Sequence, residues 1–240
     1  MSTNRFAYDL GEGVRLLVVA GIPVGVIVAG IGSRLAMLLL RLTSPDAVRG
    51  VQSDDDFTIG QVTLAGTYHL LLLGAGFGII GAAAYQWVRP WLLGPWWFRR
   101  LTVAHGSGVV VGSMLVHADG IDFRVLKPTW LAIGLFIALP ALFGLAIGSA
   151  VDRIERPGSW TTAGWKRWAL PIVLVAPFPP TLPILLVATA VLAVWLMVRP
   201  LGAVEWLRRS TGNGFVVRAL WLGIALLGLV ALRNDITAIT

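Results

Sequence analysis

The fold of this chain is decided by residues 168–198, which read WALPIVLVAPFPPTLPILLVATAVLAVWLMV. This run contains no Asp, Glu, Lys or Arg, and as a single helix it would be about 46 Å long. A bilayer core is only about 30 Å thick, and four prolines between positions 177 and 183 interrupt the run. The sequence therefore predicts a Pro-broken helical hairpin in the membrane, with a re-entrant loop or one kinked span as alternatives.

Other charge-free runs cover 16–33, 57–88, 101–118 and 128–151. A membrane-spanning helix needs about 20 mainly apolar residues, and most of these runs have that length. We expect spans at about 16–42, 62–86, 101–118, 130–150, 163–178, 181–198 and 214–233. The predicted fold class is an all-α polytopic membrane protein with 6–7 transmembrane helices, in which residues 1–240 form a single transmembrane domain.

The composition supports membrane residence and excludes several kinds of chemistry. The chain is 57% hydrophobic and 13% charged, whereas soluble proteins average about 25% charged residues. Its net charge of +7 comes from basic residues that flank apolar runs, so the bilayer is the expected partner and nucleic acid is not. The chain has no cysteine, which excludes disulfides and Cys-ligated metals. We predict no cofactor.

The distribution of Lys and Arg predicts the orientation. With a hairpin at 168–198 and a cytoplasmic N-terminus, 13 of the 19 basic residues are cytoplasmic and 6 are outside. With a single span there, the partition becomes 10 against 9. The positive-inside rule favours the first arrangement. We therefore expect a multi-pass protein of a bacterial inner membrane whose N-terminus is cytoplasmic.

Pairs of glycines four residues apart occur in several spans, namely Gly21 and Gly25, Gly74 and Gly78, Gly108 and Gly112, and Gly144 and Gly148. Such spacing lets helix backbones approach closely in a membrane. We expect packing within one bundle, with homo-oligomerisation as the alternative. The segment 76–81 matches GxGxxG, but it lies inside a span rather than in a βαβ unit, so we interpret it as packing.

A group of polar residues is predicted to converge at the outer face. The candidate cluster consists of Arg34, Asp54, Asp55, Asp56, His69, His117, Asp119 and Asp122. Ionisable groups near the membrane are functional candidates because burying a charge in lipid is costly. The alternative is that Arg34 snorkels and the Asp tract is a solvated loop. No metal site is predicted, since EF-hand and HExxH spacings are lacking, although cation binding by the acidic loop stays open.

Two connections on the same side show alternating apolar residues, at 57–62 and 121–125. Period-two alternation is typical of short strands. We therefore expect these segments to form a short two-stranded β cap over the outer face.

Five short motifs are present: GSRLAM at 32–37, DDF at 55–57, RPW at 89–91, LVHADGIDF at 115–123 and PTWL at 128–131. With these motifs the chain resembles a family of uncharacterised bacterial multi-pass membrane proteins. The resemblance covers roughly residues 14–150. It implies a multi-pass architecture and a bacterial cell membrane, and it implies no activity, substrate or site residue.

Three functions are compatible with these observations. The leading hypothesis is a non-enzymatic structural or assembly protein, as a homo-oligomer or as a subunit of a membrane complex. The alternative is a small transporter or channel that uses the Arg/Asp/His cluster and the proline break. The third is a membrane-embedded enzyme acting on a lipid, with His117, Asp119 and Asp122 as acid, base or ligands.

Overall fold

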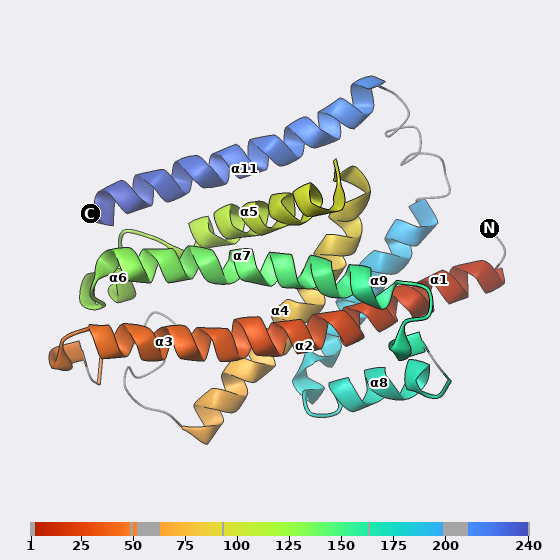
Figure 1. The fold of residues 1–240 in the computed structure, drawn as a ribbon, viewed down its shortest axis with the longest axis horizontal. Coiled ribbons are helices and arrows are strands. Elements are labelled where there is room, and N and C mark those ends of the chain that lie inside the picture. Colours follow the sequence, from red (N-terminus) through yellow and green to blue (C-terminus); the bar gives the residue numbers. More distant parts are fainter. Residues whose placement is uncertain are drawn as a thin grey trace.

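The computed structural model describes residues 3–48, 50–51, 63–92, 94–162, 164–198 and 211–239. Within these ranges, every regular element is a helix (Figure 1). The segments long and apolar enough to cross a membrane are Asn4–Thr43, Leu64–Trp91, Thr129–Ile154, Pro179–Val198 and Ala219–Ile239. The prediction of an all-helical fold is confirmed for the described residues, and the five segments that could cross a membrane are fewer than the 6–7 spans expected from the sequence.

The molecule is an elongated bundle whose N- and C-terminal ends lie at opposite ends of its long axis (Figure 1). We call the end that holds Thr3 the N side and the end that holds Thr43 the far side. Short 3₁₀ turns occur at Asp46–Val48, Arg89–Trp91 and Trp160–Thr162. The first of these lies on the far side and the other two on the N side.

The first helix runs without a break along the whole bundle. It consists of α1 (Thr3–Leu16), η1 (Leu17–Gly21), α2 (Ile22–Val24), η2 (Gly25–Ile31) and α3 (Gly32–Thr43). The segments η1 and η2 are π-helical and flank Pro23. Proline has no N–H and its ring clashes with the carbonyl group four residues earlier. Wider turns on both sides accommodate this defect, so the helix continues past Pro23.

Helix α4 (Leu64–Val88) crosses the first helix at closely packed glycines. A methyl group on Gly21 would lie 2.6 Å from the carbonyl oxygen of Gly78, and one on Gly74 would lie 2.6 Å from that of Gly25. The two backbones are therefore in direct contact. This confirms that these glycine pairs pack within the bundle.

Small residues occur on every side of α4. Gly76 faces Ile184, and Gly81 faces the ring of Phe143. The segment that matches GxGxxG therefore lies inside a helix and contacts three different neighbours, which confirms its interpretation as packing. Because it has neighbours on all sides, α4 lies at the centre of the bundle (Figure 1).

Helices α5 (Trp96–Leu115) and α7 (Thr129–Ile154) form a closely packed antiparallel pair. Gly108 and Gly112 of α5 lie against Ile137 and Ala141 of α7. The two are joined by a turn that contains α6 (Ile121–Val125). The predicted strand at 121–125 was therefore wrong, because Phe123 packs as part of a helical turn against Phe136. The other predicted strand, at 57–62, lies outside the described residues.

The segment 168–198 forms a helical hairpin, as the prolines predicted. Helix α8 (Lys166–Val175) leads through η6 (Pro179–Thr181) into α9 (Leu182–Val198). The first arm was expected at 163–178, but α8 has only 10 residues and is about 15 Å long. It is therefore too short to cross a bilayer core of about 30 Å.

The hairpin is held at both of its ends. At the tip, the hydroxyl of Tyr68 donates a 2.9 Å hydrogen bond to the carbonyl oxygen of Pro177, and its ring stacks on Phe178. At the N side, Leu192 of α9 packs closely on Gly13 of α1. Both arms therefore have their outer ends on the N side.

The last helix, α11 (Thr211–Ile239), packs mainly on α5, where Gly228 lies against Val109. Two cores stabilise the bundle. The N-side core includes Leu17, Ile79 and Ile147, and the far-side core includes Leu40, Phe123 and Leu232. The far-side core extends the bundle beyond the charge-free part of the first helix.

Candidate functional site

Arg34 lies on α3 beside the first turn of α4. Its Nη2 donates a hydrogen bond of 3.1 Å to Oγ1 of Thr67. The hydroxyl of Thr67 in turn donates to the carbonyl oxygen of Thr63 at 2.9 Å. Within the described part of the chain, Nε of Arg34 is buried and has no hydrogen-bond partner. Arg34 is therefore half-buried between two helices.

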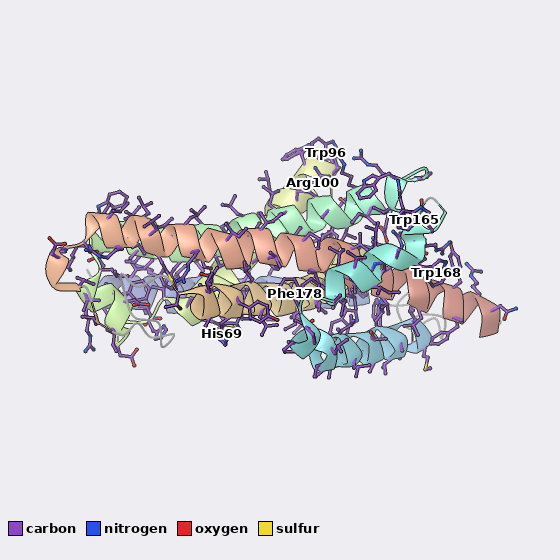
Figure 2. All side chains as sticks on the ribbon, turned by 90° about the horizontal axis from the view of Figure 1, so that it is seen from below. His69, Trp96, Arg100, Trp165, Trp168 and Phe178 are labelled. Atoms are coloured by element: carbon purple, nitrogen blue, oxygen red, sulfur yellow. The ribbon has the colours of Figure 1, made fainter. Side chains whose placement is uncertain are left out.

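The other described residues of the predicted cluster do not join Arg34. His69 follows Thr67 by two residues, so it lies on the other face of α4, and it is exposed (Figure 2). His117 and Asp119 are exposed between α5 and α6, whereas Asp122 is buried in α6. No hydrogen bond or ion pair joins Arg34, His117 or Asp119 to the other described members.

Asp54, Asp55 and Asp56 lie outside the described residues, so their convergence with Arg34 stays a prediction. In the ranges that the structure describes, no group of three or more His, Asp or Glu side chains is placed to hold a metal ion.

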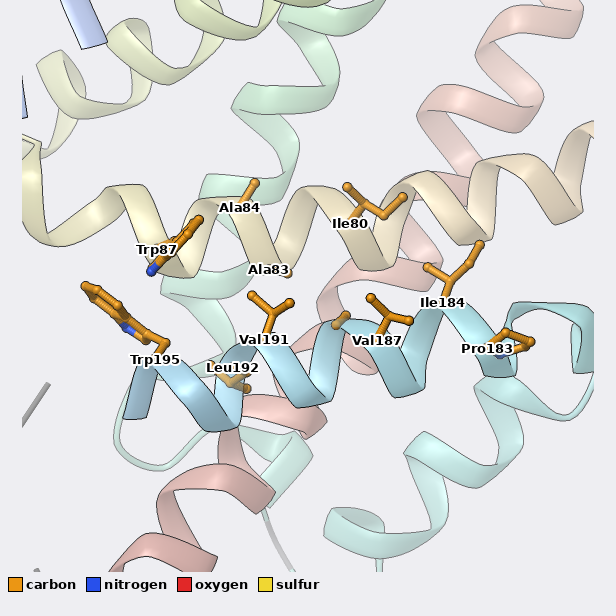
Figure 3. A pocket seen from close by; sticks show the side chains of 11 residues that line it. Ile80, Ala83, Ala84, Trp87, Pro183, Ile184, Val187, Val191, Leu192 and Trp195 are labelled. Carbon is orange, nitrogen blue, oxygen red and sulfur yellow. The ribbon is translucent and has the colours of Figure 1, made fainter. Parts of the chain in front are cut away.

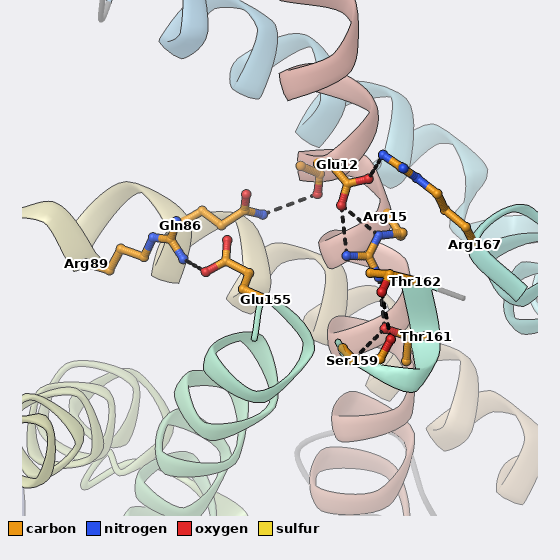
Figure 4. Close-up of polar contacts among 10 residues, drawn as sticks. Glu12, Arg15, Gln86, Arg89, Glu155, Ser159, Thr161, Thr162 and Arg167 are labelled. Atoms are coloured by element: carbon orange, nitrogen blue, oxygen red, sulfur yellow. Dashed lines mark hydrogen bonds and ion pairs between the residues drawn. The ribbon is translucent and has the colours of Figure 1, made fainter. Parts of the chain in front are cut away.

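A polar network on the N side was not predicted. It consists of Glu12, Arg15, Thr161 and Arg167 and is called the N-side network (Figure 4). Arg15 is only 5% exposed; its Nε donates to Glu12 at 2.9 Å, and its Nη1 donates to Oγ1 of Thr161 at 3.1 Å. The second carboxylate oxygen of Glu12 accepts from Arg167. One carboxylate therefore pairs with two guanidinium groups, and the three side chains together carry a net charge of +1.

The N-side network connects three separate parts of the chain. Glu12 and Arg15 lie three residues apart on one face of α1, where side chains at this spacing meet. Thr161 belongs to the turn before α8, and Arg167 is the second residue of α8. The network therefore fastens the entry of the hairpin to the first helix. Such charge-assisted hydrogen bonds are about twice as strong as neutral ones.

A second polar group links α4, α5 and α7 on the same side. The hydroxyl of Tyr85 donates to Asp152 at 3.0 Å, and Arg100 lies 3.8 Å from the other oxygen of that carboxylate. Arg89 and Glu155 form an ion pair nearby (Figure 4). Each of these charged groups has a partner of opposite sign on another helix.

Tryptophans accompany the charged residues of the N side. The guanidinium of Arg100 lies 4.9 Å from the ring centre of Trp96, and Nζ of Lys166 lies 5.8 Å from that of Trp160. Trp96, Arg100, Trp165 and Trp168 all lie in the half of the bundle that holds α1 (Figure 2). This arrangement is typical of an aromatic belt at a membrane interface.

An apolar groove runs between α4 and α9 (Figure 3). Its volume is about 510 Å³, and its walls include Ile80, Trp87, Pro183, Val187, Val191 and Trp195. Val187 is 65% exposed and Ile80 is 49% exposed, so the groove opens sideways from the bundle. At one end, the rings of Trp87 and Trp195 meet edge to face with centres 5.8 Å apart.

The sequence contained a signal for the N-side network that could have been used. Glu12 and Arg15 have helical spacing directly before a charge-free run, a pattern that indicates a charge pair near the interface. Their partners are about 150 positions away along the chain, and no local pattern points to them. The groove had no sequence signal, because it depends on how two distant helices lie together. No family model, curated protein or solved structure matches this chain.

Proposed function

We propose that this chain is a non-enzymatic integral membrane protein with a structural or assembly role, acting as a homo-oligomer or as a subunit of a larger membrane complex. An exposed stripe on the first helix carries this proposal. The stripe consists of Ile31, Leu35, Leu38 and Leu42, which are 44%, 61%, 51% and 73% exposed. Their spacing of four, three and four residues is that of a coiled-coil seam. A second helix fits such a seam.

The position of the stripe favours a protein partner over lipid. The charge-free run 16–33 is about 27 Å long as a helix, close to the thickness of the hydrocarbon core. Leu38 and Leu42 follow Arg34, so they lie beyond this run, in the headgroup region or outside it. A leucine left exposed to water there forgoes about 1.5–3 kcal/mol of burial energy. A partner helix would recover it.

The glycine seams do not provide this partner surface. Gly21, Gly25, Gly74 and Gly78 contact one another inside the chain. Assembly through these residues would require the first helix to separate from α4. The α3 stripe is therefore the surface that we assign to assembly.

We further propose five crossings and one re-entrant hairpin, with the N side in the cytoplasm of a bacterial cell. The crossings are the first helix, α4, α5, α7 and α11. Of the five segments long and apolar enough to cross a membrane, Pro179–Val198 becomes the second arm of the hairpin, and the 20-residue α5 crosses in its place. The hairpin α8–α9 enters and leaves on the N side, which is supported by the contact of Glu12 with Arg167 and of Gly13 with Leu192. The Lys/Arg partition of 13 against 6 supports the orientation.

Cysteine cross-linking tests the assembly role, because the chain has no cysteine of its own. In native membranes, Leu38→Cys should form a disulfide-linked dimer or, with a bifunctional cross-linker, an adduct with another membrane protein. Leu227→Cys is the matched control, since Leu227 is 72% exposed on α11, away from the stripe. If Leu38→Cys runs as a lone monomer and pulldown recovers no partner, the proposal is wrong.

A transporter or channel is the second candidate, and the re-entrant hairpin favours it. A helix that is broken by a proline-rich tip, as between α8 and α9, is typical of transporters, where broken helices line a substrate path. Here the tip contacts Tyr68, which directly follows the Thr67 that binds Arg34. Ion or solute flux in proteoliposomes that is lost in Arg34→Ala would support this function, and flux that is unchanged in that variant would exclude a role for Arg34.

A further inference from the structure

The groove between α4 and α9 has the length of one leaflet of a bilayer. Trp87 lies opposite Trp195 at one end, and Gly76 lies opposite Ile184 at the other. The two helices run parallel. On α9 the lining reaches from Ile184 to Trp195, which lie 11 positions and about 17 Å apart, and on α4 it covers Ile80 to Trp87. Half of a hydrocarbon core of about 30 Å is about 15 Å.

The position of the groove along the membrane normal also matches one leaflet. Gly76 lies between Gly74 and Gly78, and these two contact Gly25 and Gly21 near the middle of the charge-free run 16–33. The inner end of the groove is therefore near the centre of the bilayer. The tryptophan end lies beside the polar residues of the N side, since Gln86 donates to the carbonyl oxygen of Gly13. The groove, which lies between the Trp87–Trp195 pair and Pro183 (Figure 3), thus extends from the N-side interface to the bilayer centre.

The charge of the N side, on which the tryptophan end lies, favours an anionic headgroup. The described residues of segments 3–15, 86–100 and 152–167, which lie on the N side, contain nine Lys or Arg and four Asp or Glu. A surplus of basic residues beside a membrane attracts anionic lipids, at about 1 kcal/mol per basic residue near the surface. Trp87 and Trp195 are suited to the boundary between headgroup and acyl chain, because tryptophan is enriched there.

The size of the groove decides between a lipid chain and a helix. A transmembrane helix is at least about 10 Å across, so a 17 Å length of it would occupy about 1,300 Å³ or more. The groove offers about 510 Å³. Its floor is closed by Ala83 and Ala188, so a helix could rest on the rim but could not enter. A single acyl chain can fill it.

We propose that the groove binds one anionic phospholipid of the N-side leaflet, with an acyl chain between α4 and α9 and its phosphate at the Trp87–Trp195 end. The lipid completes the packing of the re-entrant hairpin against the bundle. This site is independent of the α3 stripe and of the assembly role.

Native mass spectrometry of the full chain tests the proposal. The detergent-purified protein is incubated with phosphatidylglycerol or, separately, with phosphatidylcholine, and the retained lipid is counted. Wild type should retain one phosphatidylglycerol at least tenfold better than phosphatidylcholine. Ala84→Phe places a ring in the groove and should reduce this retention at least tenfold, as should Val187→Trp on the rim. Ala219→Phe, a matched change at an exposed position of α11, should retain the lipid.

Three results would overturn the proposal. The first is full retention of phosphatidylglycerol by Ala84→Phe and Val187→Trp with wild-type melting temperatures. The second is equal retention of both lipids by wild type, which would show that the site does not select an anionic headgroup. The third is a dimer that becomes a monomer in Ala84→Phe, which means that a second copy occupies the groove. Failure of the assembly role is a separate result, because it is measured with Leu38→Cys.

Discussion

Gly74 lies in the middle of α4 against the backbone of the first helix, and its replacement by alanine tests the closeness of this crossing. The new methyl group would lie 2.6 Å from the carbonyl oxygen of Gly25 and 2.8 Å from the amide nitrogen of Gly30, where an ordinary contact begins at 3.4 Å. The two helices must therefore separate locally by about 0.8 Å. Neither contact atom belongs to a side chain that can rotate away.

The expected loss follows from two opposing effects. Overpacking of this kind costs about 1–3 kcal/mol, whereas alanine gains up to about 1 kcal/mol over glycine inside a helix. Gly74→Ala should therefore lose up to about 2 kcal/mol of unfolding free energy. At about 2–4 °C per kcal/mol, the melting temperature should fall by up to about 8 °C. Thermal unfolding in a mild detergent measures this change.

Two glycines of the same protein provide matched controls. Gly134 of α7 has open space around it, so Gly134→Ala should keep or raise the melting temperature. Gly76 faces only the flexible end of Ile184 at 3.0 Å, so Gly76→Ala should fall between the other two variants. A melting temperature of Gly74→Ala at or above that of Gly76→Ala would refute the argument that backbone contact governs this crossing.

Three further predictions concern the polar contacts and the hairpin. Glu12→Gln should lose about 3 kcal/mol of unfolding free energy, because Arg15 stays buried without a countercharge. Asp119→Asn is the control and should lose none. Equal melting temperatures of the two variants would contradict this prediction. Arg34→Met and Thr67→Val should each lose about 1 kcal/mol of unfolding free energy. The double variant should lose no more than either single variant, because both remove the same hydrogen bond. Additive losses would mean that the two side chains are not coupled. In intact cells, Pro180→Cys should not react with a membrane-impermeant maleimide applied to either face of the membrane. His117→Cys is the control and should react from outside. Labelling of Pro180→Cys from outside would make the hairpin a full double crossing.

In the hairpin, the local sequence predicts the position of the turn but not the length of the first arm. Its apolar length and its prolines predicted a break between positions 176 and 183, and the turn lies there. The length of the first arm could not be predicted, because uncharged residues before Lys166 end in a 3₁₀ turn rather than in a helix. The contact of Glu12 with Arg167 fixes that end, and it joins residues far apart in the chain.

For the candidate site, the sequence shows which residues are charged but not which of them are paired in the fold. The charges between spans predict a site on the far side, but there Arg34 has one described hydrogen-bond partner and His117 and Asp119 are exposed. The extensively paired charges lie on the N side, where Arg15 is buried. In the sequence, the basic residues of that side predict only the orientation of the protein in the membrane.

The sequence alone determined the membrane class, the helical architecture and the tendency of the glycines to pack, because hydropathy, proline geometry and small size act within a few residues. Only the tertiary structure decided that Gly74 meets Gly25, that Glu12 joins Arg15 to Arg167, and that α4 and α9 leave a groove between them. These features depend on the relative rotation and depth of whole helices. In a bilayer, an apolar side chain has nearly the same free energy whether it faces lipid or protein, so hydrophobicity does not select the rotation of a helix about its axis. Close packing and ion pairing select it instead.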